Sequence, residues 1–134
     1  MLKVLIVDDY FRMRQGLREL LEAAPEPMMV GEAKTGAEAV SQVRAEPWDV
    51  VVLDINLPDQ SGVEVLRQLK QARPALPVLL LSLHPGAQYL QRSLNLGAAG
   101  FLSKETAPDE LHAAIQTVLA GGTYVSRALA AEQG

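Results

Sequence analysis

The 134-residue sequence contains no cysteine, which excludes disulfide bonds, thiolate nucleophiles and thiolate metal ligands. Histidine is nearly as scarce, since only His84 and His112 occur, so we do not expect a histidine-rich zinc site. No apolar run approaches the ~20 residues that span a bilayer, and the first residues lack the pattern of a signal peptide. We therefore expect a cytoplasmic protein without a membrane partner.

An excess of positive charge is also missing. The chain has 12 lysines and arginines against 16 aspartates and glutamates, which gives a net charge of −4. Phosphate backbones select basic surfaces, so we expect no direct nucleic-acid contact by this chain. The length suits one domain, and the 49% share of hydrophobic residues is enough for a packed core.

What the sequence does have is a regular alternation of strand-like and helix-like segments. The expected strands are residues 2–7, 28–33, 49–54, 77–82 and 98–102. Helices are expected after each of them, marked by apolar residues at helical spacing: Met13, Leu17, Leu20 and Leu21; Val40 and Val43; Val65, Leu66 and Leu69; Leu90 and Leu94; and Leu111, Ile115, Val118 and Leu119. Three of these helices are expected to begin at capping residues, namely Thr35, Ser61 and Thr106.

This alternation predicts an α/β domain with a parallel sheet and helices on both faces. Segment 49–54 is apolar on both faces and is expected to be central. Binding sites in such sheets lie beyond the carboxyl ends of the strands. The residues found at or just after those ends are Asp8 and Asp9, Asp54, Ser82 and Lys104.

Together these five residues suit the chemistry of phosphoryl transfer. Three crowded carboxylates repel one another, and Mg²⁺ relieves the repulsion because it prefers oxygen ligands. Asp54 is then a candidate nucleophile towards a phosphoryl donor. Lys104 would stabilise charge on the transferring group, and the Ser82 hydroxyl would donate a hydrogen bond to it.

Each residue also has an ordinary structural interpretation. Asp8 and Asp9 can cap the first helix, and Asp54 can begin a turn. Ser82 can bond to the main chain, and Lys104 can be a solvated surface residue. The functional hypothesis therefore depends on the combination, since compatible groups at four strand ends of one domain are much rarer than any single match.

With these motifs the sequence resembles the receiver domains of two-component response regulators, which have the flavodoxin-like, CheY-like (βα)5 fold. The resemblance covers about residues 1–121. It implies an α/β fold with a doubly wound five-stranded parallel sheet of order 2-1-3-4-5. The segments that carry it are Val4-Leu-Ile-Val-Asp-Asp9, Val50-Val-Val-Leu-Asp-Ile-Asn-Leu-Pro58 with Gly62, Leu79-Leu-Leu-Ser82 and Gly97-Ala-Ala-Gly-Phe-Leu-Ser-Lys104.

The resemblance assigns a role to each acidic residue. It implies that Asp54 is the phosphoacceptor, receiving the phosphoryl group from a sensor histidine kinase. It also implies that Asp9 and Asp54 bind Mg²⁺ directly and that Asp8 acts mainly through water. The backbone carbonyl of Asn56 would complete the protein ligands.

A second set of residues matches the family's switch. Ser82 and Lys104 correspond to the pair that senses the phosphoryl group. When Ser82 moves towards that group, the loop from Leu83 to Ala87 is expected to move with it. Phe101 corresponds to the switch aromatic that turns inward, although a phenylalanine in a short strand is also an ordinary core residue. The surface of the fourth helix, fifth strand and fifth helix would then change for a partner to detect.

The segment 97–104, with Gly121-Gly-Thr-Tyr-Val-Ser126, is similar to regulators of the NarL/FixJ type. These usually continue into a helix-turn-helix DNA-binding domain and often dimerise when phosphorylated. We therefore assign residues 1–121 to a receiver domain and 122–134 to the start of a linker to a DNA-binding domain absent from this chain. Arg127–Glu132 is interpreted as the start of a linker helix, with a frayed tail as the alternative.

Three alternative functions fit an α/β domain of this kind. An aspartyl phosphohydrolase is disfavoured because Asn56, two residues after the candidate nucleophile, cannot transfer protons; we expect no turnover enzyme. A flavodoxin-like or nucleotide-binding module is disfavoured by the acidic, glycine-free loop Asp8–Arg12. A degenerate receiver that signals without phosphate is disfavoured by the intact acidic residues and Lys104, although Leu83 is bulky where many receivers carry a small residue. Asn56 and His84 lie where phosphoryl lifetimes vary, so no lifetime is predicted.

Overall fold

The structure is a computed structural model that describes residues 1–26, 28–83 and 87–126, without the side chains of 87–89. His84, most of the loop from Leu83 to Ala87, and the segment Arg127–Glu132 therefore lie outside the described residues. The strands are β1 (Lys3–Val7), β2 (Met29–Ala33), β3 (Val50–Asp54), β4 (Val78–Ser82), β5 (Gly100–Ser103) and β6 (Tyr124–Val125). The helices are α1 (Phe11–Glu22), α2 (Gly36–Ala45), α3 (Gly62–Ala72), α4 (Ala87–Asn95) and α5 (Ala107–Leu119).

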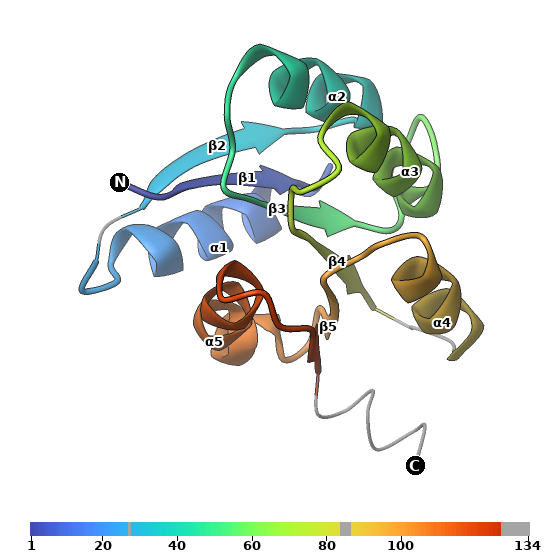
Figure 1. Ribbon diagram of the computed structural model, residues 1–134. Helices are drawn as coiled ribbons and strands as arrows, with labels where there is room; N and C mark the ends of the chain where they lie inside the picture. The colour runs from blue at the N-terminus through green and yellow to red at the C-terminus, as the bar shows by residue number, and fades with distance from the viewer. Residues whose placement is uncertain (27, 84–86, 127–134) are drawn as a thin grey trace.

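All six strands run parallel in one sheet, in the order β2-β1-β3-β4-β5-β6. Figure 1 shows α2 and α3 on one face of the sheet and α1 and α5 on the other. Each face has its own buried cluster, and the cluster under α2 and α3 also includes Leu90 of α4. Every residue of β3 and β4 is buried, as expected for central strands covered on both faces.

The expected parallel α/β sheet and its order through β5 are confirmed, but the expected number of strands is wrong. A sixth strand, Tyr124–Val125, pairs with Gly100 and Phe101 at the outer edge of β5. The amide of Ser126 extends this pairing with a 2.9 Å hydrogen bond to the carbonyl oxygen of Phe101. A two-residue strand has no periodicity to detect, and here it forms because the edge of β5 offers unpaired main-chain groups. It lies in the segment that we interpreted as a linker.

Two of the three predicted helix caps form as expected. The hydroxyls of Thr35 and Ser61 accept hydrogen bonds from the amides three residues on, at 3.1 and 3.2 Å. Thr106 stands at the start of α5, but its side chain makes no cap hydrogen bond. Its hydroxyl instead donates to the Glu110 carboxylate at 2.7 Å, and the buried Ser126 hydroxyl donates to the same carboxylate at 2.6 Å. The Glu110 carboxylate thus attaches the end of β6 to α5.

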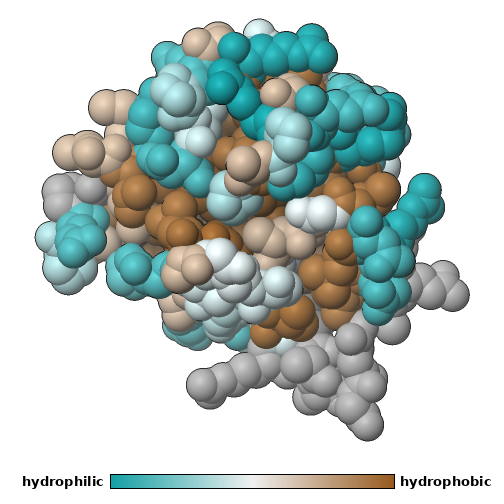
Figure 2. Space-filling view, in the orientation of Figure 1, coloured by the Kyte–Doolittle hydropathy of each residue, from teal (hydrophilic) through white to brown (hydrophobic). Residues whose placement is uncertain are grey.

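The surface is of mixed character, because a chain that is nearly half hydrophobic cannot bury all of its apolar residues. Figure 2 shows hydrophobic atoms across the middle of one face and hydrophilic atoms along its upper part. In α1, Leu17 and Leu21 are buried, whereas Leu20 is 38% exposed. The other exposed large hydrophobic residues are Met1, Tyr10, Phe11, Met29 and Leu83. Among the described residues, no helix combines the length and the apolar character needed to cross a membrane.

Candidate functional site

Two aspartates follow β1 directly and differ in their exposure. Asp8 is fully buried, whereas Asp9 is exposed. The main chain of Asp8 continues the pairing with β2, because its amide donates to the carbonyl oxygen of Ala33 at 3.1 Å. One carboxylate oxygen of Asp8, Oδ1, accepts a 2.9 Å hydrogen bond from the amide of Tyr10. The Asp8 side chain is thereby fixed at the carboxyl end of the sheet.

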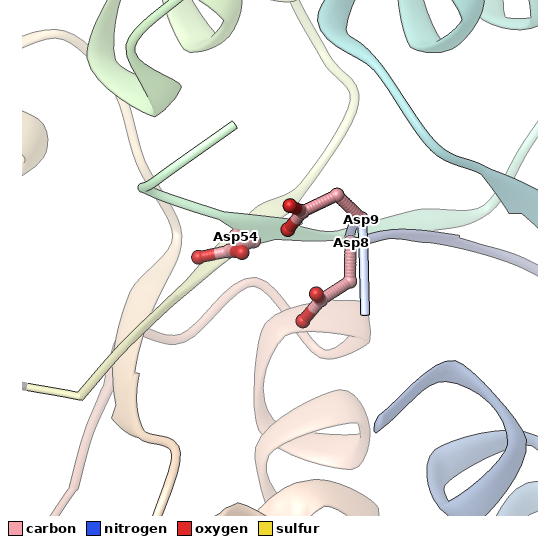
Figure 3. A group of neighbouring side chains, drawn as sticks. All are labelled: Asp8, Asp9 and Asp54. Carbon is pink, nitrogen blue, oxygen red and sulfur yellow. The ribbon is translucent and has the colours of Figure 1, made fainter. Parts of the chain in front are cut away.

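Asp54 closes β3, which pairs directly with β1. Its side chain is buried, and its Oδ1 accepts a 3.0 Å hydrogen bond from the amide of Asn56. One carboxylate oxygen from each of Asp8, Asp9 and Asp54 lies within 4.8 Å of the other two. Figure 3 shows Asp8 and Asp9 leaving adjacent positions and reaching towards the side on which Asp54 lies. The predicted convergence of the three carboxylates is therefore present.

Lys104 provides positive charge beside these carboxylates. Its Nζ atom lies 2.9 Å from Asp54 Oδ2 and 3.3 Å from Asp8 Oδ2, and its side chain is only 9% exposed. Lys104 follows β5, next to the end of β4, where the buried Ser82 lies. Charged side chains from the ends of β1, β3 and β5 thus meet at one site, and Ser82 lies at the end of β4, the strand between β3 and β5.

Burial and neighbouring charges shift the pKa values of Asp54 and Lys104. Burial raises the pKa of the Asp54 carboxyl above its ordinary value, and the negative charge of Asp8 adds to this. Hydrogen bonds from Asn56 and Lys104 offset only part of the rise in this pKa. Burial also works to lower the pKa of the Lys104 ammonium, but its hydrogen bond and attraction to Asp54, together with Asp8, outweigh burial and raise that pKa. The raised pKa of Lys104 favours its protonated form, whereas the raised pKa of Asp54 disfavours its ionised form.

The donor set fits a divalent cation. Asp8 Oδ2 is buried, and the Lys104 ammonium contacts it at 3.3 Å, which is longer than an ordinary N–H···O hydrogen bond. A buried carboxylate oxygen without a hydrogen bond is costly unless another positive group reaches it. Three carboxylates within 4.8 Å, one of them exposed to solvent, match the oxygen-rich and partly hydrated coordination that Mg²⁺ prefers.

The remaining predicted residues differ in their exposure. Asn56 is exposed at the start of the loop after β3 and forms an isolated bridge with Ser61. Phe101 is completely buried in the core under α2 and α3, so its side chain points inward in this structure. Leu83 is 48% exposed. The individual roles assigned to these residues from the sequence stay predictions.

One charged residue beside the site was missed by the sequence analysis. Arg14 of α1 is buried, and its Nη1 donates a 2.7 Å hydrogen bond to the main-chain oxygen of Asp8. A signal for it exists in the sequence, because Arg14 precedes Leu17 and Leu21 at the spacing of a buried helix face. An arginine on such a face needs a partner inside the fold, since a buried charge is rarely left unpaired.

With the geometry established, comparison with known proteins identifies the family. The family model described as the response regulator receiver domain matches residues 4–116. The chain belongs to this family. The receiver is 38% identical over 126 residues to the transcriptional regulatory protein UhpA of Escherichia coli (strain K12), covering 94% of this chain and 63% of the relative. It is 37% identical over 124 residues to the transcriptional regulatory protein DegU of Brevibacillus brevis, covering 92% and 52%.

The structural comparison agrees with this assignment. The receiver superposes on a two-component response regulator of the LuxR family from Aurantimonas sp. SI85-9A1 with a TM-score of 0.91 and 34% identity. That match covers 97% of this chain and 93% of the other. The receiver spans only about half to two-thirds of the length of UhpA and DegU.

Proposed function

We propose that this receiver domain takes a phosphoryl group from a sensor histidine kinase onto Asp54 and thereby switches its output surface. The observation that carries the proposal is the contact of the buried Asp54 carboxylate with Lys104, beside Asp8 and Asp9. An acceptor carboxylate needs a neighbouring cation to stabilise the charge of the incoming group. A flanking pair of carboxylates would supply most of a metal site.

In the proposed reaction, the phosphoryl group passes from a phosphohistidine of the kinase to Asp54. A carboxylate oxygen of Asp54 forms a new bond to phosphorus, and the phosphorus–nitrogen bond of the donor breaks. The electron pair of that bond stays on the imidazole nitrogen, which takes a proton. The Lys104 ammonium moves its contact from the Asp54 carboxylate to a phosphoryl oxygen, and the Ser82 hydroxyl donates to another. The domain accepts one group per cycle and is not a turnover enzyme.

Mg²⁺ would be held by Asp9, Asp54 and the backbone carbonyl of Asn56, with Asp8 acting mainly through water. When bound, it would neutralise charge on the phosphoryl oxygens and lower the repulsion that an anionic donor meets. Asp9 suits direct coordination because it is exposed, so an incoming hydrated cation meets it first. Asp8 is buried and already holds the Tyr10 amide, which leaves one carboxylate oxygen for the metal site.

The switch would run through the strand ends that carry Ser82 and Lys104. Movement of these groups towards a phosphoryl oxygen alters the ends of β4 and β5, and Phe101 lies in β5. In the proposed switch Phe101 is turned inward in the phosphorylated state. It is already buried here, so its outward position would belong to another conformation of the unphosphorylated domain. Phosphorylation can bias two such states only by interacting differently with each of them.

The output is proposed to be transcription, through a helix-turn-helix DNA-binding domain attached after the linker. Support comes from the relatives, because UhpA and DegU are transcriptional regulatory proteins and are longer than this chain. The net charge of −4 disfavours DNA contact by the receiver itself. Homodimerisation on phosphorylation and a cytoplasmic location complete the proposal.

Incubation with acetyl phosphate and Mg²⁺, followed by intact mass measurement and peptide mapping, tests the acceptor. We expect one added phosphoryl group on the peptide that contains Asp54, and none in the Asp54→Asn variant. The matched control is Asp49→Asn, because Asp49 precedes the same strand and binds the Lys3 amide at its opposite end. An equal adduct in Asp54→Asn, or none in the unaltered protein, would refute the proposal.

A further inference from the structure

A buried arginine supports the loop that carries the first two aspartates. Arg14 is 4% exposed and is the one buried arginine or lysine in the part of the chain that the structure describes. Its guanidinium reaches back from α1 to the end of β1, where Nη1 donates to the carbonyl oxygen of Asp8 at 2.7 Å. Its Nε donates to Glu32 of β2 at 2.9 Å. One side chain therefore joins three elements.

The hydrogen bond to Asp8 acts on two carboxylates at once. The accepting oxygen belongs to the peptide unit that links Asp8 to Asp9, and a peptide unit is rigid and planar. Its orientation sets the direction in which the Asp9 side chain leaves the main chain. The amide of Asp8 is fixed by Ala33 of β2, so the carbonyl held by Arg14 is the second fixed point of this turn.

The guanidinium is itself held in place. Glu32 accepts from Arg14 through one carboxylate oxygen and from Arg18 through the other, at 2.6 Å. The carbonyl oxygen of Glu32 accepts a 2.8 Å hydrogen bond from the side chain of Gln42 on α2. A planar guanidinium with two fixed acceptors has little freedom to rotate, which an ammonium group would retain.

We propose that Arg14 is a positioning residue for the metal site, because it fixes the peptide between Asp8 and Asp9 and so aims both carboxylates at Asp54. The proposal rests on the proposed Mg²⁺-dependent phosphorylation and adds a residue that lies outside the ligand set. Partners that orient metal ligands typically change metal affinity by about 10- to 100-fold when they are removed.

The surroundings of Arg14 favour a variant that still folds. A surface hollow of about 630 Å³ lies between α1 and α2, and Arg14, Glu32 and Phe11 are among its lining residues. In Arg14→Met, water in this hollow would reach the Asp8 carbonyl and replace the lost donor, while the methionine keeps much of the apolar stem. Water satisfies the oxygen but does not hold the peptide in one orientation.

The test is calorimetric titration of the folded protein with magnesium chloride. We expect Arg14→Met to weaken Mg²⁺ binding by about tenfold. Arg18→Met is the matched control, because it removes a second arginine partner of the Glu32 carboxylate without touching Asp8. We expect the control to change the affinity by less than about twofold.

Two further readouts separate positioning from loss of structure. Without metal, hydrogen exchange of the Tyr10 amide should accelerate in Arg14→Met, because this amide bonds to the Asp8 carboxylate. In phosphorylation by acetyl phosphate, the half-saturating Mg²⁺ concentration should rise about tenfold while the rate at saturating Mg²⁺ stays nearly unchanged. A lower stability with unchanged Mg²⁺ affinity would overturn the proposal and leave Arg14 a structural residue.

The experiment also distinguishes failure of the inference from failure of the proposed function. If the unaltered protein bound no Mg²⁺, the proposed function would fail, and the Tyr10 exchange rate alone would decide whether Arg14 holds the turn. If Arg14→Met did not fold, Arg14→Lys would replace it, because one ammonium cannot donate to Asp8 and Glu32 in the same fixed fork. Unchanged Mg²⁺ binding in Arg14→Lys would then contradict the proposal.

Discussion

The main-chain amide of Lys104 donates a 2.8 Å hydrogen bond to the carbonyl oxygen of Ser82. The two residues that match the family's phosphoryl-sensing pair are therefore joined directly through their backbones. This hydrogen bond lies just beyond Ser82 and Ser103, the last paired residues of β4 and β5. A displacement of one strand end would therefore also displace the other. In the proposed switch, this hydrogen bond would carry a local change at the acidic cluster to β5 without a long chain of intermediate contacts.

Replacing Asp54 with asparagine should stabilise the protein near neutral pH. Burial raises the pKa of Asp54, so the folded protein binds this proton more tightly than the unfolded chain. The ionised carboxylate therefore costs stability above the folded pKa, and this cost disappears as the pH falls below it. We expect Asp54→Asn to raise the free energy of unfolding by about 1 kcal/mol at neutral pH. Urea denaturation at neutral and mildly acidic pH checks this, and a gain that grows on acidification would contradict it.

Mg²⁺ should stabilise the unaltered protein and not the Asp9→Asn variant. A ligand that binds only the folded state at a hundred times its dissociation constant adds about 2.7 kcal/mol. Because Asp9 is exposed, its loss should change stability little in the absence of metal. Thermal unfolding with and without magnesium chloride measures both effects. An equal Mg²⁺-dependent rise in the melting temperature of the variant would remove Asp9 from the ligand set.

The Glu110 carboxylate should be important for keeping β6 on the sheet. It accepts hydrogen bonds from Thr106, Ser126 and, at 3.1 Å, the hydroxyl of Tyr124. Glu110→Ala would leave the buried Ser126 hydroxyl with a single remaining partner, at a cost of about 1 to 3 kcal/mol. Hydrogen exchange of the Ser126 amide should accelerate accordingly. Asp109→Asn, an exposed neighbour on α5, is the control and should leave the exchange rate unchanged.

Two glycine-to-alanine substitutions should have opposite effects. A methyl group on Gly62 would meet the Cα atom of Ile55 and lie 2.8 Å from the carbonyl oxygen of Asp54. The loop after β3 would have to move, so we expect a loss of about 1 to 3 kcal/mol. Gly16, within α1, has no heavy atom within 4 Å of such a methyl group. Gly16→Ala should gain about 0.5 to 1 kcal/mol from helix propensity, and chemical denaturation of both variants tests the contrast.

Much of the fold could be predicted from the apolar segments and helix-capping residues of the sequence. The apolar run Val50-Val-Val-Leu53, which makes up β3 up to Asp54, predicted a central strand because a strand covered by helices on both sides is apolar on both faces. Capping by Thr35 was predictable because the segment has capping-box form: the Thr35 hydroxyl accepts from the Glu38 amide, and the Glu38 carboxylate accepts from the Lys34 amide. Thr106 was not, since its hydroxyl bonds to Glu110 and lies 3.1 Å from Ser126, which the fold brings close.

The candidate site likewise has features that could be predicted from the sequence and features that could not. Convergence of Asp8, Asp9 and Asp54 was predictable, because the carboxyl ends of neighbouring parallel strands meet at one edge. The order that makes β1 and β3 neighbours came from the resemblance to the family and not from periodicity. The contact of Arg14 with Asp8 depends on the rotation of α1 about its axis, which spacing alone does not set.

The sixth strand depends on the smallest side chain in the protein. Gly100 pairs with Tyr124, and a methyl group at position 100 would collide with the carbonyl oxygen of Tyr124 and with the side chain of Leu79. Any larger residue there would force the returning chain away from the edge of β5, and the Ser126 hydroxyl would lose its place beside Glu110. Because glycine has only a hydrogen atom in place of a side chain, β6 can approach β5 closely enough to pair with it.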